Sequence, residues 1–236
     1  MKMLKMLACI SAGVALAASP VAQAGTSTGK VTVIHGISGL PAPVEVYANG
    51  GFLFSFDFPE VAGPLELPPG DYFLEVKLQG TTVLSGTAKV EAGKDYTVVA
   101  NFIYTGAAPG IKLSIFDNTV SPIVKSQSRL TVRHTADAPA VDAVVSQGRT
   151  DARNFATLPN LSSAEGGNNQ GGALDFKSGN FRARLFVAGT TTQAFDSGGL
   201  TLAKGTSYIA YAIGSLTDGT FTVVLQAIDL PTFNAK

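Results

Sequence analysis

Apolar and polar residues alternate along much of the chain beyond about residue 30. In the segment 72–78, tyrosine, leucine, valine and leucine alternate with phenylalanine, glutamate and lysine. The segment 181–187 repeats the pattern, with Arg182 and Arg184 between apolar residues. A period of two is typical of β-strands that bury one face and leave the other in water. No segment beyond residue 24 has a convincing helical period, so the pattern predicts an all-β protein.

Turn-forming residues separate these apolar runs. Clusters of glycine, proline, asparagine and aspartate occupy 49–51, 68–71 and 92–95. Such residues adopt the backbone angles that tight turns need. Their spacing predicts about seven short strands in every hundred residues or so, which is typical of a β-sandwich.

The chain beyond residue 24 contains an internal repeat. The clearest matches are Thr32–His35 with Thr131–His134 and Gly93–Val98 with Gly205–Ala210. Several matches in the same order predict two copies of one structural unit. We therefore expect two tandem immunoglobulin-like or transthyretin-like β-sandwich domains, over 25–124 and 129–236. A Gly/Asn-rich insertion in the second copy, at about 154–172, is interpreted as a surface loop, with a recognition loop as the alternative.

The first 24 residues have the three parts of a secretory signal peptide. Lys2 and Lys5 precede an apolar stretch over 6–18, and the sequence Ala-Gln-Ala ends at residue 24. The pattern predicts an exported protein, periplasmic or extracellular and cell-surface, with no transmembrane segment in the mature chain. Cys9 is the one cysteine of the chain. It leaves with the signal peptide, so neither a disulfide nor a thiolate metal site is expected.

The charged residues bear on the class of protein and its partners, and on the role of the arginines. Only 14% of residues are charged and the formal net charge is zero, which argues against a disordered chain and against a nucleic-acid partner. The six arginines all lie in the second copy, while the first copy has only lysines as basic residues. Arg182 and Arg184 share the outer face of one predicted strand. They form either a solvated strand face, which we favour, or a patch for an anionic polysaccharide or another partner.

The two histidines of the chain, His35 and His134, occupy equivalent places in the repeat. Each ends an apolar stripe, and a carboxylate follows in the next predicted strand, Glu45 or Asp142. We expect half-buried structural histidines whose carboxylate partners fix the tautomer and raise the pKa. The alternative is a pH-sensitive or metal-binding point. Zinc usually takes three or four ligands, and each copy offers one histidine, so no metal or cofactor is expected.

No motif for catalysis or for a phosphate or metal site appears. The chain lacks a G-x-S-x-G elbow, an H-E-x-x-H helix, a P-loop and a calcium-binding D-x-[DN]-x-[DN]-G loop. Alternating phenylalanines at 52, 54, 56 and 58 are interpreted as one buried strand face. If they were exposed, they would form an adhesive or partner-binding edge.

The segment Leu130–Asp142 resembles the opening motif of a bacterial family, the domain of unknown function 4397. That motif runs roughly V-R-V-x-H-x-x-x-D-A-P-A-V-D. Asp137 to Asp142 match its D-A-P-A-V-D part, and His134 corresponds to its histidine with one residue fewer in between. The segments 67–72 and 91–99 resemble the family as well. In the first copy, 36–43 departs from the Asp-Ala-Pro part of the motif. The resemblance implies a secreted or surface-associated β-sandwich protein and transfers no catalytic residue.

These observations predict a non-catalytic protein. We expect a secreted or periplasmic binding, adhesion or envelope-structural protein, whose partner is an unknown envelope protein or polysaccharide. A carbohydrate- or metal-binding accessory protein is the alternative, and a secreted hydrolase is less favoured. The candidate ligand or structural positions are His35, Glu45, His134, Asp137, Asp142, Arg182 and Arg184.

Overall fold

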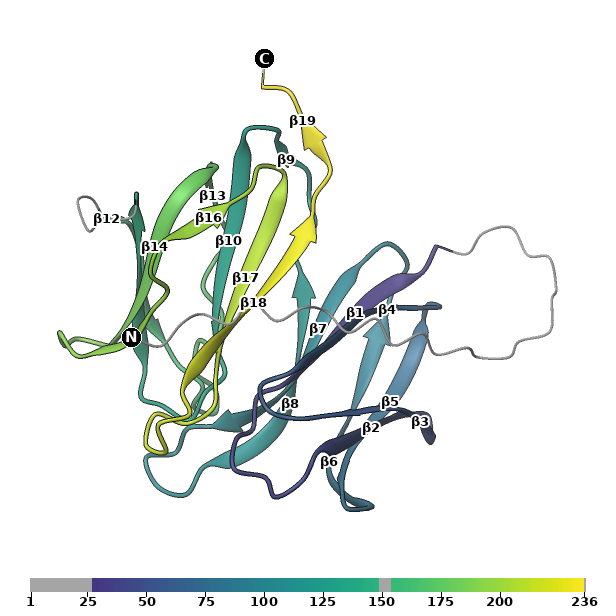
Figure 1. Cartoon of the computed structure of the whole chain (residues 1–236). Helices are drawn as coiled ribbons and strands as arrows, with labels where there is room; N and C mark the ends of the chain where they lie inside the picture. The colour runs from purple at the N-terminus through teal and green to yellow at the C-terminus, as the bar shows by residue number, and fades with distance from the viewer. Residues whose placement is uncertain (1–26, 149–153, 236) are drawn as a thin grey trace. The chain divides into compact units, whose positions relative to one another are not determined.

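A computed structural model describes residues 27–148 and 154–235 (Figure 1). The described residues form strands, turns and bends, and no helix. The prediction of an all-β protein is therefore confirmed for this part of the chain. The signal peptide predicted for residues 1–24, Cys9, Arg149 and Arg153 lie outside the described residues. Within them, no helix is long and apolar enough to cross a bilayer.

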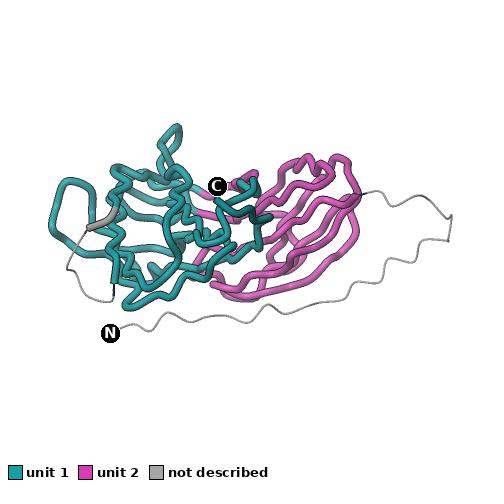
Figure 2. Tube along the Cα trace, turned by 90° about the horizontal axis from the view of Figure 1, so that it is seen from above, with its two compact units in different colours: residues 1–6, 102–110, 119–236 teal, residues 7–101, 111–118 magenta. Residues whose placement is uncertain are grey.

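The described chain divides into two compact units (Figure 2). Unit 2 contains residues 27–101 and 111–118, and unit 1 contains residues 102–110 and 119–235. Each unit has two main sheets.

Unit 2 is built from the first eight strands, apart from a few residues at the ends of the seventh and eighth that group with unit 1. These strands are β1 (Gly29–His35), β2 (Val44–Ala48), β3 (Gly51–Phe56), β4 (Val61–Leu67), β5 (Gly70–Leu78), β6 (Thr81–Val90), β7 (Asp95–Ile103) and β8 (Gly110–Asn118). One sheet has the order β4-β1-β7-β8 and the other the order β3-β2-β5-β6.

Unit 1 repeats this arrangement with later strands. They are β9 (Ile123–Val124), β10 (Gln127–His134), β11 (Val141–Gln147), β12 (Asn154–Leu161), β13 (Leu174–Lys177), β14 (Gly179–Val187), β15 (Gln193–Asp196), β16 (Leu200–Leu202), β17 (Thr206–Ile213), β18 (Thr222–Asp229) and β19 (Thr232–Phe233). The two main sheets have the orders β13-β10-β17-β18 and β12-β11-β14-β15, and β16 also pairs with β14. The short strands β9 and β19 pair with each other in parallel.

The first strand of each unit lies inside its sheet. β1 pairs in parallel with β7, and β10 pairs in parallel with β17. His35 lies opposite Ala100 in the first pair, and His134 lies opposite Ala212 in the second. The repeat seen in the sequence therefore corresponds to equivalent positions in two sheets of equivalent order.

Each unit has one apolar cluster formed by side chains of both its main sheets. In unit 2, Val31 and Val33 of β1 meet Val44 and Val46 of β2. In unit 1, the corresponding strands β10 and β11 contribute alternate residues in the same way. Fully burying one such aliphatic side chain contributes roughly 1.5–3 kcal/mol, so the alternating pattern is what holds each pair of sheets together.

The segment interpreted as an inserted surface loop is largely hydrogen-bonded to its unit. Asn154–Leu161 forms β12, which pairs with β11 as β3 pairs with β2. Further along, the carbonyl oxygen of Asn169 accepts the N–H of His134 (2.9 Å), and the N–H of Gly171 binds the carbonyl of Val132 (2.8 Å). The loop interpretation is therefore wrong for these residues, because their main chains form hydrogen bonds with β11 and β10.

Candidate functional site

His134 ends β10 with its ring fully buried. Its Nδ1 accepts the N–H of Ala136 at 3.3 Å, and its Nε2 lies 2.9 Å from the carbonyl oxygen of Pro139. Because a main-chain N–H can only donate and a carbonyl can only accept, the ring proton lies on Nε2. Burial lowers the pKa of His134, although the bond to Pro139 acts in the opposite direction. The neutral imidazole thus joins two parts of the bend after β10.

His35 occupies the equivalent place at the end of β1. Its Nδ1 accepts the N–H of Ile37 at 3.3 Å. The ring packs against Phe56 and Phe58, with centroid distances of 5.4 and 6.4 Å. Burial lowers the pKa of His35 to about 4, and the charge of Asp57 opposes this shift only in part. His35 is therefore neutral at physiological pH.

The carboxylates expected beside these rings bind other groups. Asp142 accepts the main-chain N–H groups of Asn160 (2.8 Å) and Gly189 (3.1 Å). Glu45 accepts the hydroxyl of Tyr47 at 3.3 Å. The predictions of a histidine–carboxylate pair and of a raised pKa are therefore wrong. The reason is strand alternation: the neighbours of Glu45 and Asp142 on β2 and β11 are buried in the core, so the two carboxylates point away from the histidines.

Asp137 is buried beside Ser215. The serine hydroxyl donates to Oδ2 of Asp137 at 3.0 Å, and the carbonyl of Asp137 accepts the N–H of Leu216 at 2.9 Å. A Ser-His-Asp triad needs its histidine between the serine and the carboxylate. Here the serine binds the carboxylate directly while His134 binds the main chain, so the pair fastens the bend after β10 to the loop after β17.

Arg182 and Arg184 lie on β14. Nε of Arg182 binds Oδ1 of Asp196 at 2.9 Å, and its Nη2 contacts Oδ2 of the same carboxylate. The bonds from Arg182 hold the pKa of Asp196 below its ordinary value. Arg184 places its guanidinium 5.4 Å from the ring centroid of Phe186 and binds the hydroxyl of Ser146 at 3.4 Å. The charge of Arg182 is thus neutralised within the sheet, in line with a solvated strand face.

Two further arginines, Arg129 and Arg133, are buried in β10. Nε and Nη2 of Arg129 bind the two carboxylate oxygens of Asp175, at 2.7 and 2.9 Å. Its Nη1 binds the carbonyl oxygens of Thr119 and Ser121, at 3.3 and 3.0 Å. Arg133 donates to the hydroxyl of Tyr211 at 2.6 Å. The alternating pattern predicts that this face of β10 meets water, and nothing in the sequence signals that it is covered.

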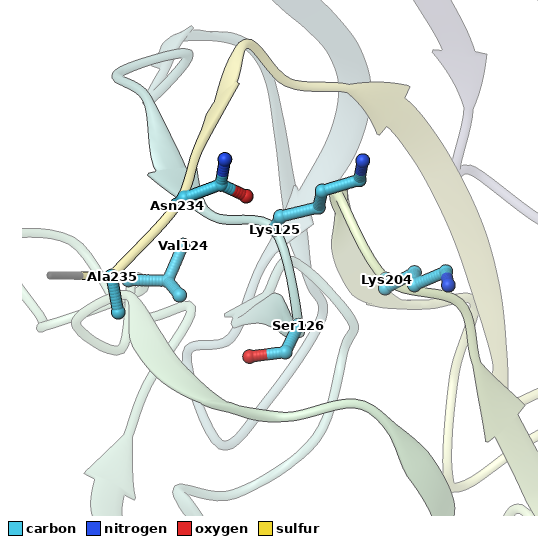
Figure 3. A pocket seen from close by; sticks show the side chains of 6 residues that line it. All are labelled: Val124, Lys125, Ser126, Lys204, Asn234 and Ala235. Atoms are coloured by element: carbon cyan, nitrogen blue, oxygen red, sulfur yellow. The ribbon is translucent and has the colours of Figure 1, made fainter.

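A shallow cavity of about 350 Å³ lies near the C-terminal end of unit 1 (Figure 3). It is lined by Val124, Lys125, Ser126, Lys204, Asn234 and Ala235. Its polar residues, Lys125, Ser126, Lys204 and Asn234, are all exposed to solvent. The cavity therefore lacks the precisely placed polar groups that orient a small ligand. Elsewhere, the residues that the structure describes hold no group of three or more His, Cys, Asp or Glu side chains suited to a metal ion.

Comparison with known proteins identifies the family of the first half of the chain. Residues 29–144 match the model of DUF4397, described as a domain of unknown function. This segment belongs to the DUF4397 family. The match includes the motif Leu130–Asp142, so the resemblance noted in the sequence is confirmed. No curated protein matches the chain.

Two solved structures from Bacteroides ovatus align with the chain. A "putative cell adhesion protein" is 11% identical with a TM-score of 0.28, and the alignment covers 89% of this chain and 100% of that one. A DUF3823 family protein is 11% identical with a TM-score of 0.19, covering 75% of this chain and 97% of that one. At these TM-scores neither alignment establishes a shared fold.

The DUF4397 segment also carries a set of exposed aromatic rings. They lie on the outer face of the sheet β3-β2-β5-β6 and belong to Phe52 and Phe73, and the half-buried ring of Tyr47 lies on the same face. The prediction of one buried face for the phenylalanines of β3 is wrong for Phe52. Val46 pairs with Phe54 but Tyr47 pairs with Phe52, so Leu53 is an extra residue in the strand. This bulge turns Phe52 outward, while Phe56 remains in the core.

Proposed function

We propose that this protein is an exported, non-catalytic binding or envelope-structural protein. In this proposal its two units are immunoglobulin-like or transthyretin-like β-sandwich domains over about 25–124 and 129–236. One observation carries the proposal: both histidines are buried and bind main-chain groups.

Histidine is the side chain whose ordinary pKa suits it best to proton transfer near neutral pH. A catalytic base must also reach its substrate. Burial of His35 and His134 opposes such contact, and the bonds of His134 leave neither ring nitrogen available. The hydroxyl of Ser215 donates to Asp137 rather than to a histidine, and both residues are buried away from any substrate. These contacts favour a structural role for the residues that a hydrolase would use.

The alternative, an accessory protein, would bind either a metal ion or a carbohydrate. A metal-binding role gains no support from the described residues, since they bring no three suitable side chains together. A carbohydrate-binding role is favoured by the exposed rings of Phe52 and Phe73 and by the half-buried ring of Tyr47 on the same face. The order of the three hypotheses therefore remains binding or structural protein first, accessory protein second and hydrolase last.

Purified protein tests the absence of catalysis. We expect it to turn over ester, peptide and glycoside substrates no faster than buffer does, and we expect His134→Asn to leave those rates unchanged. Turnover above buffer that disappears in the variant, while its far-UV spectrum stays native, contradicts the proposal.

Cell fractionation tests export. The protein is expected in the periplasm, the medium or the outer cell surface, with Gly25 as its first residue by mass spectrometry. A cytoplasmic protein that retains residues 1–24 would show that the export part of the proposal is wrong.

A further inference from the structure

Three aromatic side chains form a row across neighbouring strands of unit 2. Phe52 of β3 lies opposite Tyr47 of β2, and Tyr47 lies opposite Glu75 of β5. Phe73 precedes Glu75 by two residues, so its side chain points to the same face. Phe52 is 54% exposed and Phe73 is 47% exposed, which is unusual for large apolar side chains.

The spacing of the row follows from sheet geometry. The rings of Tyr47 and Phe52 meet edge to face, with centroids 5.5 Å apart. With strands about 4.8 Å apart and about 3.4 Å per residue, the Cα atoms of Phe52 and Phe73 lie roughly 12 Å apart. The row is therefore long enough for a short stretch of a linear polymer rather than for a single small molecule.

Polar groups border the row on the same face. Nζ of Lys77 lies 4.2 Å from the ring centroid of Tyr47 and 3.8 Å from Oε1 of Glu75. The hydroxyl of Thr82 donates to Oε1 of Glu75 at 3.0 Å, and the hydroxyl of Tyr47 donates to Glu45 at 3.3 Å. The charges of Lys77 and Glu75 are thus paired with each other. The carboxylates of Glu45 and Glu75 keep lone pairs that can accept further hydrogen bonds.

The backbone beneath the row is fixed. Asn49 binds the main chain of Phe73 on both sides: its Oδ1 accepts the N–H of Phe73 at 2.9 Å, and its own N–H binds the carbonyl of Phe73 at 2.8 Å. The rings stand on paired strands rather than on a loop. Little ordering is therefore needed when a ligand binds, which lowers the entropic cost.

We propose that this face binds a neutral polysaccharide. The proposal rests on the non-catalytic binding function above and names its ligand class. Sugar rings present an apolar C–H face bordered by hydroxyl groups. The C–H faces would lie on Phe52 and Phe73, and the hydroxyls would donate to Glu45 and Glu75 and accept from Lys77.

Area and charge favour this ligand over a protein. A half-exposed phenylalanine offers about 100 Å². Two of them fall well short of the roughly 800 Å² per partner that a stable protein interface buries. Because Lys77 and Glu75 are paired with each other, the face has no strong field of one sign to select an anionic chain.

Native gel electrophoresis in gels containing a soluble polysaccharide tests the proposal. The probes are galactomannan, mixed-linkage β-glucan and arabinoxylan as neutral chains, with alginate as an anionic one. We expect at least one neutral polymer to retard the protein, and alginate not to do so. Phe73→Ala should weaken the retardation at least about fivefold, as for the removal of an anchor side chain.

Phe233→Ala is the matched control. Phe233 is 51% exposed on β19 of unit 1, so the substitution removes the same exposed area away from the row. It should leave retardation unchanged. Phe73→Tyr should retain binding because it keeps a flat ring, whereas Phe73→Leu should lose it although it keeps apolar area. Thermal melting of every variant checks that the fold is intact.

Four results overturn the proposal. The first two are the absence of retardation by every neutral polymer and retardation by alginate alone. The third is equal binding by Phe73→Leu and Phe73→Tyr. The fourth is a dimer, detected by sedimentation, that the substitution Phe52→Ala dissociates. The last result would assign the face to a second copy of the chain. A reducing-sugar assay on the same mixtures separates the two proposals, since sugar release with retained binding contradicts only the absence of catalysis.

Discussion

His35 and His134 accept the same hydrogen bond in the two units. In each, Nδ1 receives the main-chain N–H of the residue two positions further on, at 3.3 Å. Both rings are buried at the end of a strand with a parallel partner, which is β7 in unit 2 and β17 in unit 1. The neutral imidazole is therefore a repeated structural element that stabilises the bend after the first strand.

We expect the free energy of unfolding to fall as the pH falls from 6.5 towards 4. Burial lowers the pKa of His35 to about 4 and lowers that of His134, whereas both have ordinary values near 6.5 in the unfolded chain. Between these values the unfolded chain binds protons that the folded protein does not. For His35 the loss amounts to about 3 kcal/mol over this range. Urea unfolding at pH 7.5, 6.0, 5.0 and 4.0 measures it.

The double variant His35→Asn/His134→Asn is the control for this pH dependence. It should be less stable than the wild type at pH 7.5, because it loses ring packing and the bond to Pro139. Its stability should also change less between pH 7.5 and 5.0. A wild-type stability that stays constant over this range would show that the two histidines titrate normally in the folded protein.

Arg129→Ala should destabilise unit 1 by about 3 kcal/mol, the cost of breaking a buried ion pair. The variant leaves Asp175 without its partner and frees the carbonyls of Thr119 and Ser121. Asp175→Asn should cost a similar amount, because it leaves the buried guanidinium of Arg129 without its counter-charge. Denaturant unfolding of the single and double variants gives the coupling energy. Strict additivity of the two effects would contradict a direct interaction.

The carboxyl group of Asp196 should titrate below the ordinary range of aspartate. Its folded pKa is lowered by the bonds from Arg182, so its stabilising effect is present at neutral pH and is lost as the pH falls through that pKa. Carboxyl ¹³C NMR measures the titration directly. Arg182→Gln should raise the pKa of Asp196, and Arg184→Gln should raise it less. An unchanged midpoint in Arg182→Gln would exclude the ion pair.

Gly63→Ala should destabilise unit 2 by about 3 kcal/mol. Gly63 has φ +116, and an added Cβ would lie 2.8 Å from the carbonyl oxygen of Val31. Gly51→Ala is the matched control. A Cβ there would meet only the carbonyl of Ala48 at 3.5 Å, so we expect a change within about 0.5 kcal/mol. Thermal unfolding of the two variants compares the costs, and equal costs would contradict a close approach at Gly63.

The sequence predicts the all-β class and the equivalence of the two histidines because both depend on local periodicity. Val31, Val33 and His35 share one face by alternation alone, and the structure buries all three. The partners of His134 could not be predicted in this way. Its bond to Pro139 depends on how the bend folds back, which leaves no periodic signal.

The exposure of Phe52 departs from the favoured interpretation, one buried strand face, for a related reason. Strict alternation places Phe52 with Phe54 and Phe56, and a single extra residue at Leu53 reverses the side on which Phe52 lies. A bulge of this kind is decided by the pairing of β3 with β2. Arg133 was missed because burial of the second face of β10 depends on the whole fold rather than on the strand's own sequence.

The parallel pairing of β1 with β7 sets the order of events during biogenesis. Lys30 pairs with Asp95 and His35 with Ala100. More than sixty residues of sequence therefore separate β1 from its parallel neighbour in the sheet. The sequence separation between β10 and β17 is larger still, since His134 pairs with Ala212. Contacts this distant in sequence form slowly. A growing chain that ends before β7 therefore cannot complete the sheet β4-β1-β7-β8 of its first unit, because β1 still lacks its parallel partner.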